Sequence, residues 1–546
     1  MKNAGHIIDY LIQGEVEYLF GIPAGSVNAI FDELYDRKEL TPVVAKHEGA
    51  AALMAAAYAK YSGKLGVVIG CSGPGAMNLV TGAANAQREQ IPLLILTGAV
   101  PLSTMGWNAS QELNAEPVFK PVTKYSKRVE KPEDLLTELH KAVQMALEGI
   151  PGPVHLALPI DVQLQPAQQV ELPPFPAFNT LGAKQEEIEK AAEVMKGKKG
   201  VLFLGNGSRN SVAEALALAE KLSWPFVTTP QAKGLIPYDH PLHSGVYGFA
   251  GHPGAVKLVH EGDHDILLIA GSSLGETATS NYQDLLTKDR TIIQIDRDQS
   301  VFTRKYKIDY PLEGDCASTI KDLLALLPEA EQIIEGAGVT PAVEIIKPEK
   351  VQKYDTKTVL PLLQSMLSDK TRYTVDIGEF MSYVIHYMEV KESHTFDINV
   401  HYGSMGTGIA SSLGLALAKP EEQIACITGD GCFFMHGMEI LTAKEYNLPI
   451  TFIVLNNSRL GMVHHGHSLQ YKRVHERFSQ SFTSIASIVD AVNIPSLVIT
   501  SLEDFDQEAL NDLLKYKGPR LIEINLVDNS VPPMGDRVKF LSSFSK

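Results

Sequence analysis

The sequence predicts an α/β protein made of three doubly wound domains, each with a parallel sheet that helices cover on both faces. The first observation is that short apolar runs, rich in β-branched residues, alternate with segments of helical spacing. Such runs are typical of strands that a parallel sheet buries on both faces. The second is the length, because 546 residues correspond to three or four domains. The third is a pair of segments rich in proline, glutamine or glycine that divide the chain.

Residues 1–162 are expected to form the first domain. An apolar run from residue 18 leads into a Gly/Pro turn at 21–25, and a second glycine-rich turn covers 71–78. An alanine-rich segment from 49 to 61 predicts a helix. The other apolar runs that predict strands cover residues 41–45, 65–70, 92–97 and 154–158.

Two linkers separate the remaining domains. Residues 163–182 are rich in proline and glutamine, which predicts an extended linker over the surface, and residues 336–355 predict a second one. The second domain is expected to cover 183–335 and the third 356–546. The strands expected in the second domain include 200–204, 226–229, 266–270 and 291–295.

Composition narrows the kind of partner. The net charge is −16 and no long basic run occurs, which argues against nucleic acid or an anionic membrane as a partner. No apolar run is long enough to span a bilayer. The four cysteines have no CxxC spacing, which indicates reduced thiols. Since the chain opens on an amphipathic helix and not on a signal peptide, we expect a cytoplasmic protein.

The most informative stretch runs from residue 424 to 462 and reads as strand, turn, helix, strand, turn. The first apolar run ends in Gly429-Asp430-Gly431, helical spacing then continues to about residue 446, and the second run, 450–455, ends in Asn456-Asn457. Because parallel strands joined by a helix end at the same edge of the sheet, we expect Asp430 and Asn457 to lie side by side.

This pairing predicts a Mg²⁺ ion that holds a diphosphate. Mg²⁺ prefers hard oxygen ligands and shares them between a few protein groups, water and phosphate. Asp430 offers a carboxylate, Asn457 an amide oxygen and Arg459 a backbone carbonyl. The helix that opens after Gly431 directs free N–H groups at phosphate, and glycines allow the backbone to approach closely. The alternative is an ordinary βαβ unit with polar loops.

The GDG and NN pair, about 25 residues apart, resembles the thiamine diphosphate fingerprint. Residues 461–471, Gly-Met-Val-His-His-Gly-His-Ser-Leu-Gln-Tyr, resemble the acetohydroxyacid synthase and acetolactate synthase (pyruvate oxidase-like) family in particular. The resemblance implies a pyrimidine-binding first domain, a central Rossmann-like domain and a third domain that binds diphosphate and Mg²⁺. The cofactor-binding residues that it implies are Pro23, Glu48, Pro74, Asn78, Gly378, Ser404, Met405, Gly429, Asp430, Gly431, Cys432, Asn457, Leu460, Gly461 and Met462.

The resemblance also implies three catalytic residues, Glu48, Gln111 and Gly25. Glu48 stands where this family keeps its essential acid, which bonds N1′ of the aminopyrimidine and favours the imino tautomer that deprotonates C2. The alternative is a helix N-terminal carboxylate that serves the helix dipole. Gln111 aligns with a glutamine that contacts the bound intermediate. Met405 matches the apolar wedge that bends thiamine; the alternative is a core methionine.

Several positions depart from the family pattern. Glu379 follows Gly378 where Gln or Ser is usual, so an acid stands beside the expected diphosphate. Ser273 replaces an arginine, His252 a methionine and Gly466 a tryptophan, and we expect these three residues to line the acceptor pocket. Without the tryptophan the pocket is open, and without the arginine it lacks a positive charge. These two changes predict an acceptor that is larger than a short keto acid or lacks a carboxylate.

The resemblance predicts a lyase or transferase that decarboxylates pyruvate, or a related 2-keto acid, and transfers the acyl-anion unit to a carbonyl acceptor. The alternatives are a 2-keto-acid decarboxylase, a flavin-linked pyruvate oxidase, and a non-catalytic homologue. FAD binding is possible but is not implied by the resemblance, because the family's Arg-Phe-Asp-Asp-Arg stretch is replaced here at residues 271–277. A homodimer or homotetramer is expected, with each site between the first domain of one subunit and the third of another.

Overall fold

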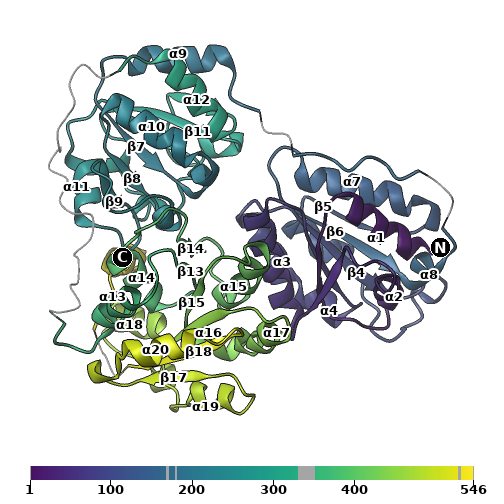
Figure 1. The fold of residues 1–546 in the computed structure, drawn as a ribbon. Helices are drawn as coiled ribbons and strands as arrows, with labels where there is room; N and C mark the ends of the chain where they lie inside the picture. Colours follow the sequence, from purple (N-terminus) through teal and green to yellow (C-terminus); the bar gives the residue numbers. More distant parts are fainter. Residues whose placement is uncertain (1, 168–170, 179–180, 330–350, 527–529, 545–546) are drawn as a thin grey trace.

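The computed structural model describes residues 2–167, 171–178, 181–329, 351–526 and 530–544. These residues form three sheets, each with six parallel strands and with helices around it (Figure 1). The predicted fold class, α/β with three doubly wound parallel sheets, is therefore confirmed. Among the described residues, no helix is both long and apolar enough to cross a membrane.

The first sheet has the order β2-β1-β3-β4-β6-β5. Its strands in that order are Thr41–Val44, Tyr18–Gly21, Gly66–Gly70, Leu93–Ala99, Pro153–Pro159 and Tyr125–Arg128. The helices around it are α1 Asn3–Gln13, α2 Asn28–Glu33, α3 Glu48–Ser62, α4 Pro74–Asn78, α5 Val80–Arg88, α6 Glu116–Phe119, α7 Leu135–Leu147 and α8 Ile160–Leu164. The carboxyl ends of β2, β1 and β3 therefore lie next to one another.

The second sheet has the order β12-β11-β10-β7-β8-β9. Its strands in that order are Tyr310–Glu313, Thr291–Asp296, Ile266–Ala270, Gly200–Leu204, Phe226–Thr228 and His243–Val246. Helices α9 Gln185–Met195, α10 Val212–Leu222, α11 Pro253–Glu261 and α12 Cys316–Leu326 cover it.

Residues 171–178 of the predicted first linker have no helix or strand, and Phe175 packs on Tyr10. Residues 336–350, which make up most of the predicted second linker at 336–355, lie outside the described residues.

The third sheet has the order β14-β13-β15-β16-β18-β17. Its strands in that order are Phe396–Ile398, Arg372–Val375, Ile424–Gly429, Ile450–Asn456, Arg520–Asn525 and Ser496–Ile499. The helices of this part are α13 Thr356–Met366, α14 Glu379–Tyr387, α15 Thr407–Ala418, α16 Asp430–His436, α17 Ile440–Glu445, α18 Gly461–Tyr471, α19 Ile485–Asp490, α20 Gln507–Leu514 and α21 Gly535–Ser543.

The helical segment expected between Gly431 and residue 446 is divided in the structure. Helix α16 ends at His436, a 3₁₀ turn, η10, covers Gly437–Glu439, and α17 follows. A Cβ atom at Gly437 would lie 2.5 Å from the ring of Phe433, so the ring packs over the glycine where the helix changes. The prediction of one continuous helix was wrong at this point.

The first and third parts of the chain share one hydrophobic core. Helix α3 lies along α15, as Figure 1 shows, and the buried residues of both helices belong to the same cluster. Both contact faces consist mostly of small residues, which lets the backbones approach closely. A Cβ atom at Gly414 would lie only 2.2 Å from the carbonyl oxygen of Met54.

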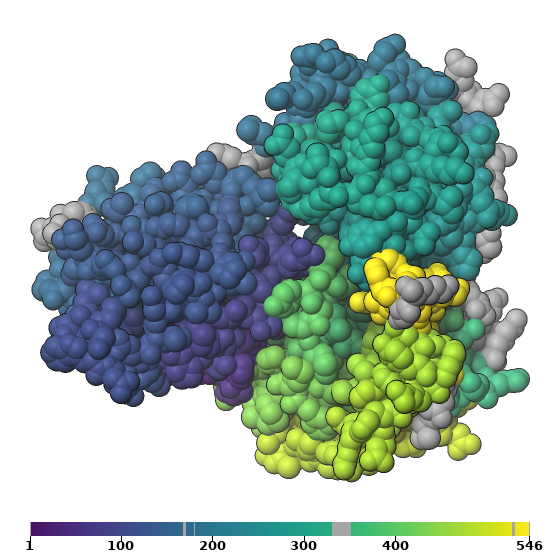
Figure 2. Space-filling model, turned by 180° about the vertical axis from the view of Figure 1, so that it is seen from behind, coloured from purple at the N-terminus to yellow at the C-terminus, as the bar shows by residue number. Residues whose placement is uncertain are grey.

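The C-terminal helix connects two other parts of the molecule. Figure 2 shows the C-terminal residues, in yellow, at the boundary between the second sheet's domain and the third. Arg537 lies 3.6 Å from Glu276, and the ring of Phe540 lies 6.4 Å from that of Tyr282. The hydroxyl of Tyr383 donates to the carbonyl of Ser530 at 3.1 Å.

The close approach of α3 and α15 gives a stability test. Alanine has a higher helix propensity than glycine by about 1 kcal/mol, so Gly414→Ala would stabilise a free helix. Here the new methyl group meets the Met54 carbonyl, and we expect a net loss of about 1–3 kcal/mol in unfolding free energy. Denaturant unfolding measures it. Gly275→Ala is the control because no atom of the described residues lies within 4 Å of its Cβ position. Equal stabilities of the two variants would contradict the packing.

Candidate functional site

The carboxyl ends of β13, β15 and β16 meet at one edge of the third sheet. Gly429, at the end of β15, pairs with Leu455 of β16. The residue after Gly429 is Asp430, whose pKa burial raises, and the backbone N–H groups of Ser458 and Arg459 lie close enough to its carboxylate to oppose part of that rise. The structure therefore brings Asp430 to the turn that contains Asn457.

Asp376 holds a further loop against this edge. It is fully buried after β13 and accepts three hydrogen bonds: from the N–H of Ile377 at 2.8 Å, from the N–H of Gly406 at 2.8 Å and from the hydroxyl of Thr428 at 3.1 Å. Burial raises the pKa of Asp376, and these donors oppose that shift. The loop that carries Ser404 and Met405 is thereby fixed beside the strand ends.

The glycine of the GDG turn leaves room between two apolar side chains. A Cβ atom at Gly431 would lie 3.2 Å from the Cε atom of Met405 and 3.3 Å from the Cδ2 atom of Leu460. Nearby, the thiol of Cys432 donates to the carbonyl of Ile377 at 3.0 Å. Gly378 is the N-cap of α14, in extended backbone. The expected residues around the diphosphate thus gather at this edge, and helices α14 and α16 begin there.

The donor set at this edge fits a divalent cation. Burial raises the pKa of Asp430 to about 6, and the negative charge of Glu379 adds to that rise. A cation beside Asp430 would compensate the buried charge. The Asn457 amide oxygen accepts from the Arg459 N–H at 3.2 Å, and the Arg459 carbonyl accepts from the Gly461 N–H at 3.0 Å. A carbonyl oxygen has two lone pairs, so both groups keep an acceptor position for a metal.

Glu379 does not point freely at the expected diphosphate. It is 7% exposed, and its carboxylate accepts a hydrogen bond from the side-chain amide of Asn457. The guanidinium of Arg459 lies 3.6 Å from it and the ring of His465 3.2 Å. A Cβ atom at Gly461 would lie 2.2 Å from the Glu379 carboxyl carbon, so the glycine makes room for this group. The acid is turned toward α18 and is paired there.

Glu48 is the first residue of α3 and lies beside the glycine-rich turn of α4. The side-chain amide of Asn78 donates to its carboxylate at 3.0 Å. A Cβ atom at Gly75 would lie 3.1 Å from the same carboxylate. Pro74 occupies the first turn of α4. The structure therefore brings Glu48 together with the turn after β3, at the carboxyl edge of the first sheet.

Gln111 reaches the same edge from a distant loop. It is exposed, and its φ of +61° is unusual for a residue with a side chain. The hydroxyl of Ser72 donates to the Gln111 carbonyl at 2.7 Å. The N–H of Ser72 donates in turn to the hydroxyl of Ser26 at 2.9 Å, next to Gly25 in the loop that also holds Pro23. An unusual backbone conformation held in place at a strand edge is typical of functional sites.

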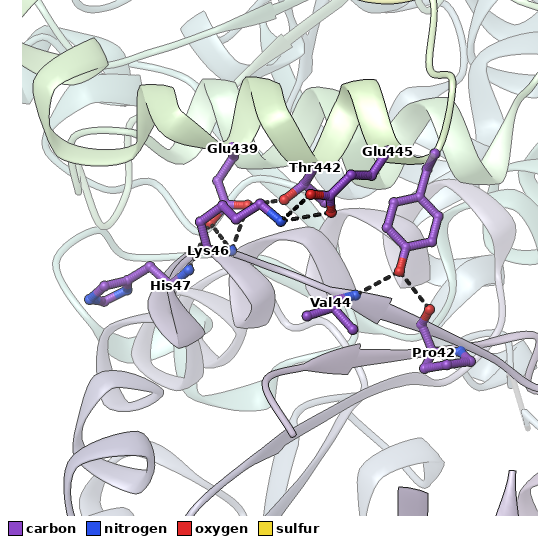
Figure 3. Close-up of polar contacts among 8 residues, drawn as sticks. Pro42, Val44, Lys46, His47, Glu439, Thr442 and Glu445 are labelled. Atoms are coloured by element: carbon purple, nitrogen blue, oxygen red, sulfur yellow. Dashed lines mark hydrogen bonds and ion pairs between the residues drawn. The ribbon is translucent and has the colours of Figure 1, made fainter. Parts of the chain in front are cut away.

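A set of polar contacts from the third domain holds the strand that leads to Glu48. The carboxylate of Glu439 accepts from the backbone N–H groups of Lys46, at 3.0 Å, and His47, at 2.9 Å (Figure 3). The ammonium group of Lys46 lies 2.7 Å from Glu445. We did not predict these contacts, because only the fold reveals which backbone groups a carboxylate faces.

The three residues expected in the acceptor pocket lie in different surroundings. His252 is buried; its Nδ1 accepts from the Val246 N–H at 2.9 Å and its Nε2 donates to the His386 carbonyl at 3.0 Å. Burial lowers the pKa of His252 well below its usual range, so the ring is neutral. Within the described part of the chain, a Cβ atom at Gly466 would meet only the Cε atom of Met534, at 3.7 Å.

Ser273 lines a cavity of about 970 Å³ at the carboxyl edge of the second sheet. The lining includes Asn206 and Gly207 after β7 and Asp296 at the end of β11, but neither His252 nor Gly466. Burial raises the pKa of Asp296 to about 6. Residues of the first and third domains also reach into this cavity, among them Arg88 and His401.

Known proteins match all three parts of the chain. Residues 1–118 match the N-terminal TPP binding domain of thiamine pyrophosphate enzymes, residues 188–323 the central domain and residues 376–524 the C-terminal TPP binding domain. The chain belongs to the thiamine pyrophosphate enzyme family. The resemblance inferred from the GDG and NN pair is thereby confirmed.

Relatives of this thiamine pyrophosphate enzyme extend over nearly its whole length. It is 33% identical to the probable acetolactate synthase large subunit of Methanocaldococcus jannaschii, over 98% of this chain and 93% of the relative. It is 31% identical to the corresponding protein of Methanococcus aeolicus, over 98% and 94%. It is 29% identical to the acetolactate synthase isozyme 1 large subunit of Escherichia coli, over 97% and 95%.

The pairing of Glu379 gives a prediction for stability. Glu379→Gln removes the negative charge that faces Arg459 and His465 in a buried site, and breaking such a pair costs about 3 kcal/mol in unfolding free energy. Denaturant unfolding of the cofactor-free protein measures this. Glu476→Gln is the matched control, because Glu476 is 85% exposed and its contact with Arg477 spans 3.9 Å. If both variants unfold alike, the paired arrangement of Glu379 is wrong.

Proposed function

We propose that this thiamine pyrophosphate enzyme is a carboligase of the acetolactate synthase type. It removes CO₂ from pyruvate, or a related 2-keto acid, and joins the remaining acyl-anion unit to an acceptor carbonyl. The observation that carries the proposal is the meeting of Asp430 with the Asn457 turn at one strand edge, in a chain whose relatives are named acetolactate synthases. The domains of the proposal are 1–162 for the pyrimidine, 183–335 for the central part and 356–546 for the diphosphate and Mg²⁺.

The residues of this chain have separate tasks in the proposal. Bound thiamine diphosphate supplies the electron sink that lets a 2-keto acid lose CO₂. Asp430, Asn457 and the Arg459 carbonyl hold Mg²⁺ against the diphosphate. Met405 would support the bound cofactor as an apolar contact, and Glu48 would hold and move a proton at N1′ of the aminopyrimidine. Gln111 contacts the reacting group, and the Gly25 loop approaches it from β1.

The position of Gly466 supports an acceptor of larger size or without a carboxylate. Among the described residues, only Met534, the N-cap of α21, comes within 4 Å of the Cβ position. Methionine is flexible and adapts to differently shaped neighbours. In the proposal, Met534 and α18 bound the acceptor space, while His252 supports the backbone near α14 and takes no direct part.

An exposed apolar surface supports the proposed dimer. Phe434, Met435 and Met438 are 49%, 57% and 43% exposed, on α16 and the turn after it. Exposed apolar clusters of this kind mark protein interfaces. We propose that a second subunit covers this surface and that each site lies between two subunits. Light scattering on a size-exclusion column gives the mass: a dimer or tetramer is expected, and a stable monomer would refute it.

The cavity beside Ser273 supports one alternative, a flavin-linked pyruvate oxidase. The cavity volume of about 970 Å³ suits a large nucleotide cofactor. The alternative requires bound flavin, which absorbs visible light, and bleaching of that absorbance when pyruvate is added without oxygen. A colourless purified enzyme that turns over pyruvate would exclude it.

The deciding experiment incubates the enzyme with pyruvate, thiamine diphosphate and Mg²⁺, with and without carbonyl acceptors, and identifies products by mass. The proposal expects CO₂ release coupled to a carbon–carbon bond, with pyruvate or a second carbonyl compound as acceptor. Acetaldehyde as the sole product would indicate a simple decarboxylase. No turnover with any acceptor, despite bound cofactor, would favour a non-catalytic homologue and overturn the proposal.

Glu48 gives the sharpest mutational prediction. Glu48→Gln removes the proton-sharing carboxylate and should lower pyruvate turnover by a factor of about 10² or more, while the protein stays folded. The steady-state rate at saturating cofactor measures this. Glu39→Gln, an exposed acid of the same domain, should turn over pyruvate like the unaltered enzyme. Comparable rates for both variants would remove Glu48 from the mechanism.

A further inference from the structure

We propose that Glu439 is a positioning residue that fixes the backbone in front of Glu48 from across the domain boundary. The inference rests on the proposed function, in which Glu48 is the acid. It assigns a role to a residue that touches neither the expected cofactor site nor the expected acceptor pocket. Its basis is the set of contacts between the turn after α16 and the end of β2 (Figure 3).

The Glu439 carboxylate is buried, and both of its oxygen atoms accept hydrogen bonds. The residue is 1% exposed. Its Oε1 atom accepts from the N–H groups of Lys46 and His47, and its Oε2 atom accepts from the N–H of Lys46 at 3.1 Å and from the Thr442 hydroxyl at 2.7 Å. Hydrogen bonds to a charged acceptor are stronger than those between neutral groups. The carboxylate therefore fixes two consecutive peptide groups.

Those two peptide groups come immediately before the acid. His47 is the N-cap of α3, and its Nδ1 atom accepts from the N–H of Gly49 at 2.9 Å. Glu48 is the next residue and the first of the helix. Because no flexible residue lies between the held peptide groups and Glu48, a rotation of the backbone at 46–47 would move the Glu48 carboxylate directly.

Glu445 and Tyr446, which follow Glu439 in the third domain, also contact the outer side of β2 and the residues after it. β2 is an edge strand of the first sheet, so no strand of the described residues pairs with its outer backbone groups. The Tyr446 hydroxyl accepts from the Val44 N–H at 2.9 Å and donates to the Pro42 carbonyl at 2.8 Å. Lys46 adds an ion pair with Glu445. The third domain therefore supplies hydrogen bonds to the outer backbone groups of β2 at Val44 and Pro42.

Glu439 is also connected to the expected cation site through the chain. The segment that begins with Asp430 at the strand edge continues through α16 to Glu439, and the ring of His436 lies 5.5 Å from that of His47. One short segment thus carries a proposed metal ligand at its start and the support of Glu48 near its end. Because each proposed site lies between two subunits, this Glu48 serves the other site of the dimer, and the segment connects the two sites.

The test compares three variants. Glu439→Ala removes every acceptor atom that faces residues 46 and 47. Glu439→Gln is the conservative variant, because its amide oxygen still accepts from both N–H groups and its NH₂ group can donate to Thr442. Glu445→Ala is the matched control, because it removes a contact between the same domains that involves only the Lys46 side chain, at an acid whose side chain is 54% exposed.

The first measurement uses the cofactor-free protein. Hydrogen–deuterium exchange read by mass spectrometry should show the backbone amides of the 44–49 peptide exchanging about tenfold faster in Glu439→Ala. In Glu439→Gln and Glu445→Ala this peptide should exchange nearly as in the unaltered protein. Equal protection in all variants would overturn the proposal. If Glu439→Ala does not fold, Tyr446→Phe loosens the same strand and should raise exchange at Val44.

The second measurement separates positioning from general damage. Deuterium exchange at C2 of bound thiamine diphosphate should slow about tenfold in Glu439→Ala, while the cofactor dissociation constant changes by less than about threefold. Glu439→Gln should restore the rate. A parallel loss of affinity and rate, without rescue by Gln, would show a merely structural role and overturn the proposal. Normal exchange in Glu48→Gln would instead refute the proposed function.

Discussion

The contact between α3 and α15 is the constraint on which the rest of the structure depends. The two helices approach to backbone distance, since a methyl group at Gly414 would overlap the Met54 carbonyl. Helix α3 begins with Glu48, and α15 begins at Thr407, two residues after Met405. The orientation of these helices therefore decides where Glu48 lies relative to the third domain of its own subunit. A small residue is required at Gly414, the point of close approach, because a larger one would push the two helices apart.

Two buried acids at the carboxyl edge of the third sheet have their charges balanced in different ways. Asp430 and Glu379 are both buried acids near one turn. The structure separates their surroundings: Glu379 faces Arg459, His465 and the Asn457 amide, whereas Asp430 faces backbone N–H groups at the strand edge. The charge of Glu379 is compensated by neighbouring groups of the protein. Asp430 keeps the acceptor atoms that a cation between protein and diphosphate requires.

The sequence was sufficient for the central strands and for the residues at their ends. The strands that it did not single out include β5, β9, β12, β14 and β17, which all lie at sheet edges, where short and partly polar runs give no clear apolar signal. The β18 strand was also missed, because its pattern contains Arg520 and Glu523, which the fold buries with partners. The bonds of Glu439 and the pairing of Glu379 depend on distant segments, and no local pattern encodes them.

A crystal structure of the enzyme grown with thiamine diphosphate and Mn²⁺ in place of Mg²⁺ tests the central claim most directly, because manganese is located by its anomalous scattering. The account predicts a single strong peak bound by Asp430, Asn457 and the Arg459 carbonyl, with a Glu48 carboxylate at hydrogen-bond distance from the aminopyrimidine. Manganese at another place, or an aminopyrimidine with no Glu48 beside it, would contradict the account.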